Sequence, residues 1–182
     1  MKRLVLTLTI IILCFSACKK EQKPDEKTIL IQTISQTEMF ALQNSEAIDR
    51  KIADSLINLY DRFEKLYPQD SLCAEFMYKA TDIAVNIKDC TRALEHIQKI
   101  TDGYSTSDYV EWAYYFKAII YSDVCNDKDK ATEAYKFFLD NYPQSKFAKE
   151  ANVMLNMLQM QNEMQIIREF EAKNQNKESD SI

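Results

Sequence analysis

The sequence predicts an all-α fold, an α-solenoid of antiparallel helix pairs with about two to three repeats plus terminal helices. One unit occurs twice between residues 76 and 145, because a shift of 38 residues superimposes its two copies. Tyr67, Tyr104 and Tyr142 recur at spacings of 37 and 38 residues, a period typical of stacked helix pairs. One Gly and three Pro are too few turn residues for a sheet-rich fold.

The two copies agree at apolar, small and capping positions. The aligned pairs include Tyr78 with Phe116, Ala80 with Ala118, Asp89 with Asp127, Ala93 with Ala131 and Ile100 with Phe138. Aspartate is a favoured N-cap, so Asp89 and Asp127 are each expected to begin the second helix of a pair. Small alanines are expected where the paired helices approach closely.

The first predicted helices occupy residues 45–67 and 72–87. Pro68 separates them, because the residue before a proline is forced out of the α region, and Asp70 and Ser71 can cap the second helix. The first helix carries an apolar stripe at spacings of three and four, composed of Ile48, Ile52, Leu56, Leu59, Phe63 and Leu66. A weaker helix is expected over residues 28–34.

The second half of the chain continues this pattern. Gly103 follows the helix that Asp89 caps, where a left-handed backbone is expected. Asp108 and Glu111 resemble a capping box at the start of the next helix. The helix capped by Asp127 is expected to stop at Tyr142-Pro143. Ser145 then begins a long final helix, whose residues 159–172 are expected to cap or overhang the array.

The first residues are typical of an export signal. Lys2 and Arg3 precede an apolar run of about a dozen residues, which is too short to span a bilayer. Small residues just before Cys18 resemble a lipobox, which predicts cleavage before Cys18 and acylation of that cysteine. An ordinary cleaved signal and an uncleaved anchor are the alternatives.

This assignment divides the chain into four parts. They are a lipoprotein signal peptide (1–17), the lipidated cysteine with a tether (18–35), the helical repeat domain (36–172) and a polar tail (173–182). Removal of the signal leaves 21 basic residues against 28 acidic ones, a net charge of −7. Nucleic acid is therefore not an expected partner. The expected location is the cell envelope, lipid-anchored on the periplasmic face of the outer membrane.

The repeats also resemble a known family. Ala93, Tyr114, Ala118 and Ala131, with the turns that begin Tyr67-Pro68-Gln69 and Tyr142-Pro143-Gln144, are similar to tetratricopeptide-repeat (TPR) proteins. The resemblance is greatest to the bacterial envelope subset whose repeats close with an aromatic-Pro-x-Ser turn. This subset includes repeat proteins associated with the Tol–Pal system and with outer-membrane β-barrel assembly. It covers roughly residues 45–160 and implies a TPR-like solenoid that binds other proteins. No peptide-carboxylate clamp is visible, so no ligand-contact residue is carried over from the family.

No group of residues predicts catalysis, a cofactor or a metal site. His96, the single histidine, is expected to be an ordinary surface residue of an outer helix rather than a catalytic base. One glycine cannot build a Gly-rich phosphate loop. Cys73, Cys90 and Cys125 remain after the signal and Cys18 are set aside. Stacked repeats bring Cys90 and Cys125 to neighbouring helix ends, so a disulfide is possible there; otherwise all three are small buried residues.

The aromatic run in the first helix of the second copy is the best candidate for a binding surface. Four bulky rings cannot all be buried on one helix, so one or two are expected to face a concave groove. The candidates are Tyr115 with Trp112 or Tyr109, which could hold an extended segment or a helix of a partner. Packing between repeats is the alternative explanation of these rings.

The sequence therefore predicts a non-enzymatic, lipid-anchored scaffold that binds another cell-envelope protein through its repeat groove. A permanent structural subunit of an outer-membrane assembly is the alternative. A small-ligand carrier or an enzyme is a third hypothesis, which would need a closed apolar pocket. The partner's identity and the oligomeric state are not predicted.

Overall fold

The computed structural model describes residues 25–44 and 48–179, and within them every regular element is a helix. The all-α prediction is confirmed. The seven α-helices of this described part are α2 (Glu26–Asn44), α3 (Arg50–Leu66), α4 (Leu72–Asn86), α5 (Cys90–Gln98), α6 (Val110–Ile119), α7 (Lys128–Asn141) and α8 (Ala148–Ser179). Two π-helical turns, η1 (Lys99–Gly103) and η2 (Ile120–Val124), extend α5 and α6.

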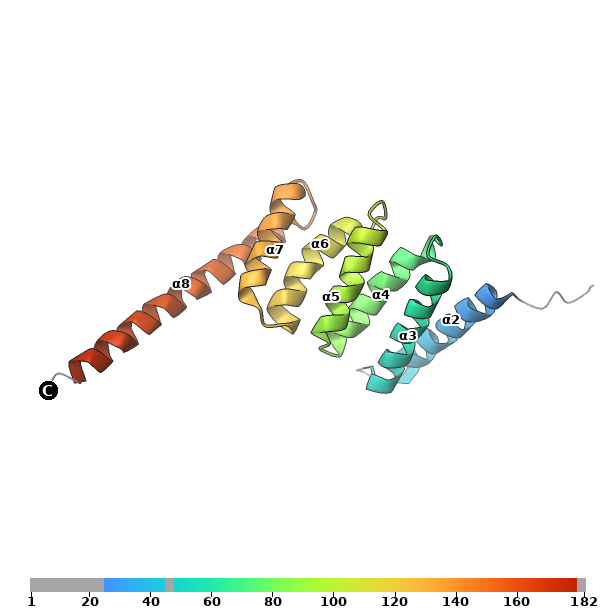
Figure 1. Ribbon diagram of the computed structural model, residues 1–182, viewed down its shortest axis with the longest axis horizontal. Helices are drawn as coiled ribbons and strands as arrows, with labels where there is room; N and C mark the ends of the chain where they lie inside the picture. Colours follow the sequence, from blue (N-terminus) through green and yellow to red (C-terminus); the bar gives the residue numbers. More distant parts are fainter. Residues whose placement is uncertain (1–24, 45–47, 180–182) are drawn as a thin grey trace, which may run out of the picture.

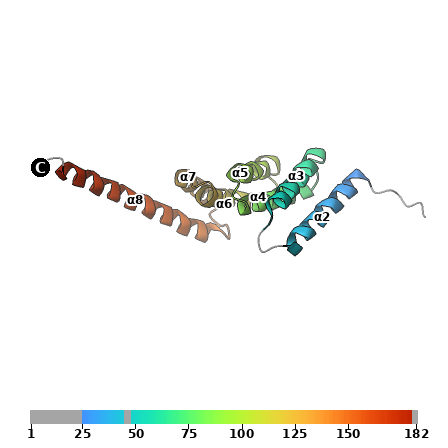
Figure 2. The same ribbon diagram turned by 90° about the horizontal axis from the view of Figure 1, so that it is seen from below.

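The helices pack in chain order, each against the next, and form an elongated array (Figure 1). Helices α3, α5 and α7 lie in one layer and α4 and α6 lie in a second layer (Figures 1 and 2). Helices α2 and α8 stand at opposite ends, and α8 projects well beyond the other helices (Figure 1).

Capping aspartates begin the helices of the first layer. The side chain of Asp49 accepts a hydrogen bond from the Lys51 backbone N–H at the start of α3, at 2.8 Å. Asp89 and Asp127 accept from the N–H groups of Arg92 and Lys130, at 3.2 and 3.0 Å. The predicted caps at Asp89 and Asp127 are therefore confirmed. Each satisfies an N–H group that the first turn of a helix cannot pair internally.

Asp108 does not cap α6, contrary to the prediction. The residue before this helix is Tyr109, and no side chain caps it. The Glu111 carboxylate accepts a hydrogen bond from the Ser145 hydroxyl, just before α8. Glu111 thus links α6 to the segment that precedes α8 instead of closing a local capping box.

The prediction of a left-handed backbone at Gly103 is also wrong. Gly103 has no positive φ, and a Cβ built on it would meet no described atom within 4 Å. Among the described residues the positive φ values belong to Lys88 (57°) and Asn126 (54°). These two residues each precede a capping aspartate and are 38 positions apart. The sharp reversals thus lie between the helices of a pair rather than after the pair.

The core forms two clusters. The larger one extends from α2 to α6, and the smaller one joins α6, α7 and α8. Helix α3 buries Ala53, Leu56, Ile57, Tyr60 and Phe63, whereas Leu66 is 45% exposed. The predicted stripe is therefore displaced around the helix, because α3 packs against both α2 and α4 and buries a broader face than one neighbour requires.

The boundaries of the domain differ from the prediction at both ends. The tether was expected to reach residue 35, but α2 begins at Glu26 and buries Leu30 and Ile34 against the core. Glu38 of α2 also accepts hydrogen bonds from Tyr60 Oη (2.7 Å) and Lys79 Nζ (3.0 Å). Residues 26–35 are thus part of the packed domain.

At the other end, α8 continues to Ser179 through much of the expected polar tail. The predicted signal peptide (1–17) and Cys18 lie outside the described residues. None of the described helices combines the length and the apolar character that crossing a bilayer requires.

Candidate protein-binding groove

Aromatic rings on α4 and α6 form a continuous row. The ring of Tyr78 on α4 lies 5.1 Å from that of Tyr109 and 4.5 Å from that of Trp112, measured between ring centroids. Trp112 in turn stacks on Phe116, one turn further along α6, at 4.6 Å. All four side chains are only partly buried. Tyr109, Trp112 and Phe116 follow one helical stripe because these positions are three and four residues apart. Tyr78 extends the row onto α4.

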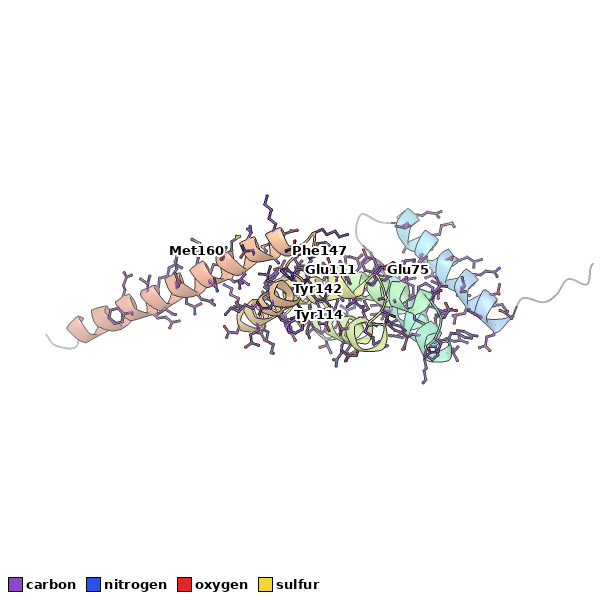
Figure 3. The ribbon with its side chains drawn as sticks, turned by 90° about the horizontal axis from the view of Figure 1, so that it is seen from above. Glu75, Glu111, Tyr114, Tyr142, Phe147 and Met160 are labelled. Carbon is purple, nitrogen blue, oxygen red and sulfur yellow. A yellow bond between two sulfur atoms is a disulfide. The ribbon has the colours of Figure 1, made fainter. Side chains whose placement is uncertain are left out.

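An open groove of about 510 Å³ lies beside three of these rings, those of Tyr78, Tyr109 and Trp112. It extends from α4 across the start of α6 to the segment that precedes α8. Its lining residues are Tyr78, Asp108, Tyr109, Glu111, Trp112, Gln144, Ser145, Lys146 and Phe147. Figure 3 shows Glu111 and Phe147 close together on the same side of the molecule. The groove thus spans successive helices of one layer.

The rim of the groove carries charges of both signs. Lys146 Nζ lies 4.9 Å from the ring centroid of Phe147, a distance compatible with a cation–π contact. Asp108 and Glu111 supply negative charge on the same rim. Beyond Tyr109, Glu75 pairs with Lys79 at 2.9 Å. Burial, together with the nearby Glu75 carboxylate, raises the pKa of Tyr109, so its phenol remains neutral and can donate a hydrogen bond.

The predicted binding residues separate into two groups. Tyr109 and Trp112 line the groove, but Tyr115 does not. Tyr115 is only 5% exposed and stacks on Phe147 at 4.8 Å, with Phe138 at 5.5 Å on α7. Tyr115 directly precedes Phe116, so its side chain points about 100° away from that of Phe116 around α6. It packs toward α7 and the start of α8. Packing between helices, the alternative explanation, holds for this ring.

A second hollow, of about 400 Å³, lies between α6 and α7. It is lined by Tyr114, Lys117, Tyr121, Lys130, Glu133, Ala134 and Phe137. In Figure 3, Tyr114 lies on the other side of the body from Phe147. Tyr114 was not predicted as part of a separate surface, although its i+3 and i+7 partners Lys117 and Tyr121 indicate one shared helix face.

His96 is buried rather than exposed, contrary to the prediction. It is 2% exposed; its Nε2 lies 3.0 Å from Asp61 Oδ1 and its Nδ1 lies 2.7 Å from the Arg92 carbonyl oxygen. The signal was present in the sequence, since position 96 completes the apolar spacing of Ala93, Ile97 and Ile100. The contact with Asp61 joins α5 to α3 and lies apart from the groove.

Cys90 and Cys125 form a disulfide, with their Cα atoms 5.2 Å apart. It joins the start of α5 to the residue that follows η2. Cys73 is a free, buried thiol whose Sγ lies 3.1 Å from the Tyr67 carbonyl oxygen. The alternative that cysteines serve as small buried residues therefore describes Cys73 alone. Within residues 25–44 and 48–179, no cluster of His, Cys, Asp and Glu side chains could hold a metal ion.

The described residues form an all-helical domain of seven helices that pack in chain order. A scan against protein-family models finds no match for the chain. A search of curated proteins also finds no significant match. The groove therefore has to be interpreted from its own residues.

Proposed function

We propose that the chain is a non-enzymatic, TPR-like scaffold that binds a segment of another cell-envelope protein in the groove beside Tyr109 and Trp112. The observation that carries this proposal is the row of partly exposed rings along an open groove across α4, α6 and the start of α8. Aromatic rings supply much of the binding energy in protein interfaces, because they bury a large area at a low cost in side-chain entropy.

The repeat interpretation rests on structural equivalences between the two copies. Lys88 and Asn126 share the same left-handed backbone, and Asp89 and Asp127 cap the following helices in the same way. Tyr104 and Tyr142 occupy the same position after the second helix of each pair, and each donates its backbone N–H to a carbonyl four residues earlier. These equivalences support a solenoid of helix pairs.

The shape and charge of the groove favour a peptide segment as the ligand. The groove is open along its length, and its rim offers Lys146 as a cation and Asp108 as an anion beside the apolar rings. An amphipathic helix or an extended strand could place apolar side chains on Trp112 and polar ones on the rim. A small molecule would need a more enclosed, apolar cavity.

The location at the envelope rests on the sequence of the first residues, with acyl chains on Cys18 as the membrane anchor. The Cys90–Cys125 disulfide supports an oxidising compartment, though weakly, because cytosolic proteins generally keep their thiols reduced. We propose attachment to the periplasmic face of the outer membrane.

Site-specific photo-cross-linking tests the proposal. A photoreactive phenylalanine derivative replaces Tyr109 in the full chain, and the same derivative replaces Glu95, an exposed residue of α5 in the other layer. We expect irradiation of intact cells to attach one envelope protein to the Tyr109 variant and none to the Glu95 variant. Equal attachment from both positions, or none from Tyr109, would contradict binding in this groove.

Trp112 provides a second measurement because it is the only tryptophan of the chain. Titration with the purified partner that cross-linking identifies should shift the fluorescence emission of Trp112. The shift should reach a plateau as the binding site fills. The Trp112→Phe variant lacks this fluorophore, so titration calorimetry measures its binding. Its affinity should be about tenfold lower, since a hot-spot ring costs about 1–2 kcal/mol or more when shortened. A chain that aggregates whenever the partner is missing would instead favour the permanent structural subunit.

A further inference from the structure

Helix α8 has apolar residues on two opposite faces. The domain covers one face as far as Leu158, beyond which Ile166 on the same face is 66% exposed. Ala151, Leu155 and Leu158 are buried against the rest of the domain. Residues two positions away lie about 200° around the helix. That opposite face is about half exposed at every apolar position, namely Val153 (51%), Met157 (50%), Met160 (61%), Met164 (48%) and Ile167 (56%).

The spacing on the uncovered face is that of a coiled-coil seam. The five residues follow one another at intervals of four, three, four and three, a seven-residue repeat. Met157 and Met164 occupy the a positions, and Val153, Met160 and Ile167 occupy the d positions. A single helix cannot bury this seam by itself, and a strict 3.5-residue period matches a supercoiled partner helix better than a flat surface.

Charges beside the seam indicate what the partner helix is. In this register Glu163 is a g residue and Arg168 is the e residue five positions later. Both side chains are exposed. In a parallel, in-register pair, a g residue faces the e residue of the next heptad on the other helix. Glu163 of each copy would then meet Arg168 of the other, and both contacts would be between opposite charges.

The other orientation lacks this complementarity. An antiparallel pair brings g residues near g residues and e residues near e residues, so Glu163 would approach another Glu163 or Arg168 another Arg168. The domain also leaves space for a second helix, because α7 packs on the opposite side of α8 and the C-terminal part of α8 projects freely (Figure 1).

We propose that α8 pairs with α8 of a second copy of this chain in a parallel, in-register, two-stranded coiled coil. The two domains then lie on opposite sides of the pair, because each covers the outer face of its own α8. This arrangement goes beyond the proposed function: it joins two copies of the groove in one particle and lets a divalent partner bind more tightly than one groove allows.

Cysteine substitution along the seam tests both the pairing and its direction. The full chain carries Met157→Cys, Met164→Cys or Ile167→Cys, and mild oxidation is applied to intact cells. A parallel, in-register pair places every seam position opposite its own copy, so all three variants should form a covalent dimer. The matched control is Gln159→Cys, an exposed position off the seam, which should remain monomeric.

A charge exchange in the Met164→Cys background tests the identity of the partner. Glu163→Arg or Arg168→Glu alone places like charges across the pair, and each should lower the yield of covalent dimer several-fold. The double variant Glu163→Arg/Arg168→Glu restores opposite charges and should recover the original yield. Because both residues are exposed, neither change should alter folding, which circular dichroism checks.

Three results would overturn the proposal. Cross-linking at only one seam position would indicate an antiparallel pair. Covalent attachment to a different protein would show that the seam belongs to another partner. Failure of the double variant to recover the yield, or no cross-link from any seam position, would exclude a parallel pair of copies of this chain.

Discussion

The Nε2 atom of His96 lies 3.0 Å from Oδ1 of Asp61, which ties the buried side of α5 to α3. Lys99 Nζ donates to the same oxygen at 2.8 Å. Nearby, Arg92 of α5 pairs with Asp54 of α3 at 2.7 Å. The contact between α3 and α5 therefore depends on a polar network as well as on apolar packing, and the single buried histidine lies at its centre.

Replacement of His96 by alanine should destabilise the domain strongly. The change leaves a cavity beside a 2% exposed position and removes a hydrogen-bond partner of Asp61. We expect the free energy of unfolding to fall by about 2–4 kcal/mol, as for other buried side chains that are cut back to alanine. Urea unfolding measures it, and Glu95→Ala at the exposed neighbouring position should change stability by less than about 0.5 kcal/mol.

Asp61 should make stability depend on pH in the acid range. Burial alone would raise the pKa of Asp61, but hydrogen bonds from His96 and Lys99 lower it from 3.8 to about 2. A carboxylate with a lowered pKa stabilises the folded state above its unfolded pKa, and this contribution is lost as the carboxylate is protonated. Stability should therefore decline as the pH falls from 3.8 toward 2.

The Asp61→Asn variant should lack this part of the pH dependence. Urea unfolding of both proteins at several pH values between 5 and 2.5 would measure it. The difference in the free energy of unfolding between wild type and variant should narrow as the pH decreases. A constant gap over that interval would show that Asp61 does not have a lowered pKa.

Reduction of the Cys90–Cys125 disulfide should destabilise the domain without changing the fold. The bond closes a loop with a sequence separation of 35 residues, for which chain entropy predicts about 4 kcal/mol. Urea unfolding with and without reductant measures the difference. The Cys90→Ser/Cys125→Ser variant should match the reduced wild type and be insensitive to reductant. A strong effect of reductant on this double variant would assign the stabilisation elsewhere.

The backbone conformations of Lys88 and Gly103 favour opposite substitutions at these two positions. Lys88→Gly should stabilise the domain by up to about 1 kcal/mol, because φ at Lys88 is 57° and a Cβ is strained there. Gly103→Ala should also stabilise it, by about 0.5–1 kcal/mol, since Gly103 is helical and an added Cβ meets nothing within 4 Å. Thermal unfolding measures both; destabilisation by Gly103→Ala would mean that a glycine is needed there.

Tyr115 and Tyr109 should respond differently to truncation although both are on or beside α6. Tyr115→Ala removes a 5% exposed ring that stacks on Phe147, and should cost about 3–5 kcal/mol. Tyr109→Ala removes a partly exposed ring of the groove and should cost about 1 kcal/mol while weakening partner binding. Chemical unfolding together with the Trp112 titration would separate the two roles.

Most of the helices could be predicted from the sequence because their signals are local. Asp89 and Asp127 identify two helix starts, since a capping side chain acts within one turn. Tyr67-Pro68 and Tyr142-Pro143 identify two helix ends for the same reason. Within the candidate groove, the aromatic run around Trp112 was also recognisable as a surface feature.

Features that depend on several neighbours were not predictable in the same way. Which of Trp112 and Tyr115 is exposed depends on the positions of α4, α7 and Phe147, which lie far away in the sequence. The stripe of α3 and the burial of His96 depend on how many helices surround each one.

By itself, then, the sequence determined that the chain is helical and where most of its helices begin and end. Only the tertiary structure decided which side of each helix is covered, which carboxylate meets His96, and that one apolar face of α8 stays about half exposed between Val153 and Ile167. The physical reason is that caps and prolines act on the backbone within a single turn. Burial is set instead by the sum of all the surfaces that pack around a residue.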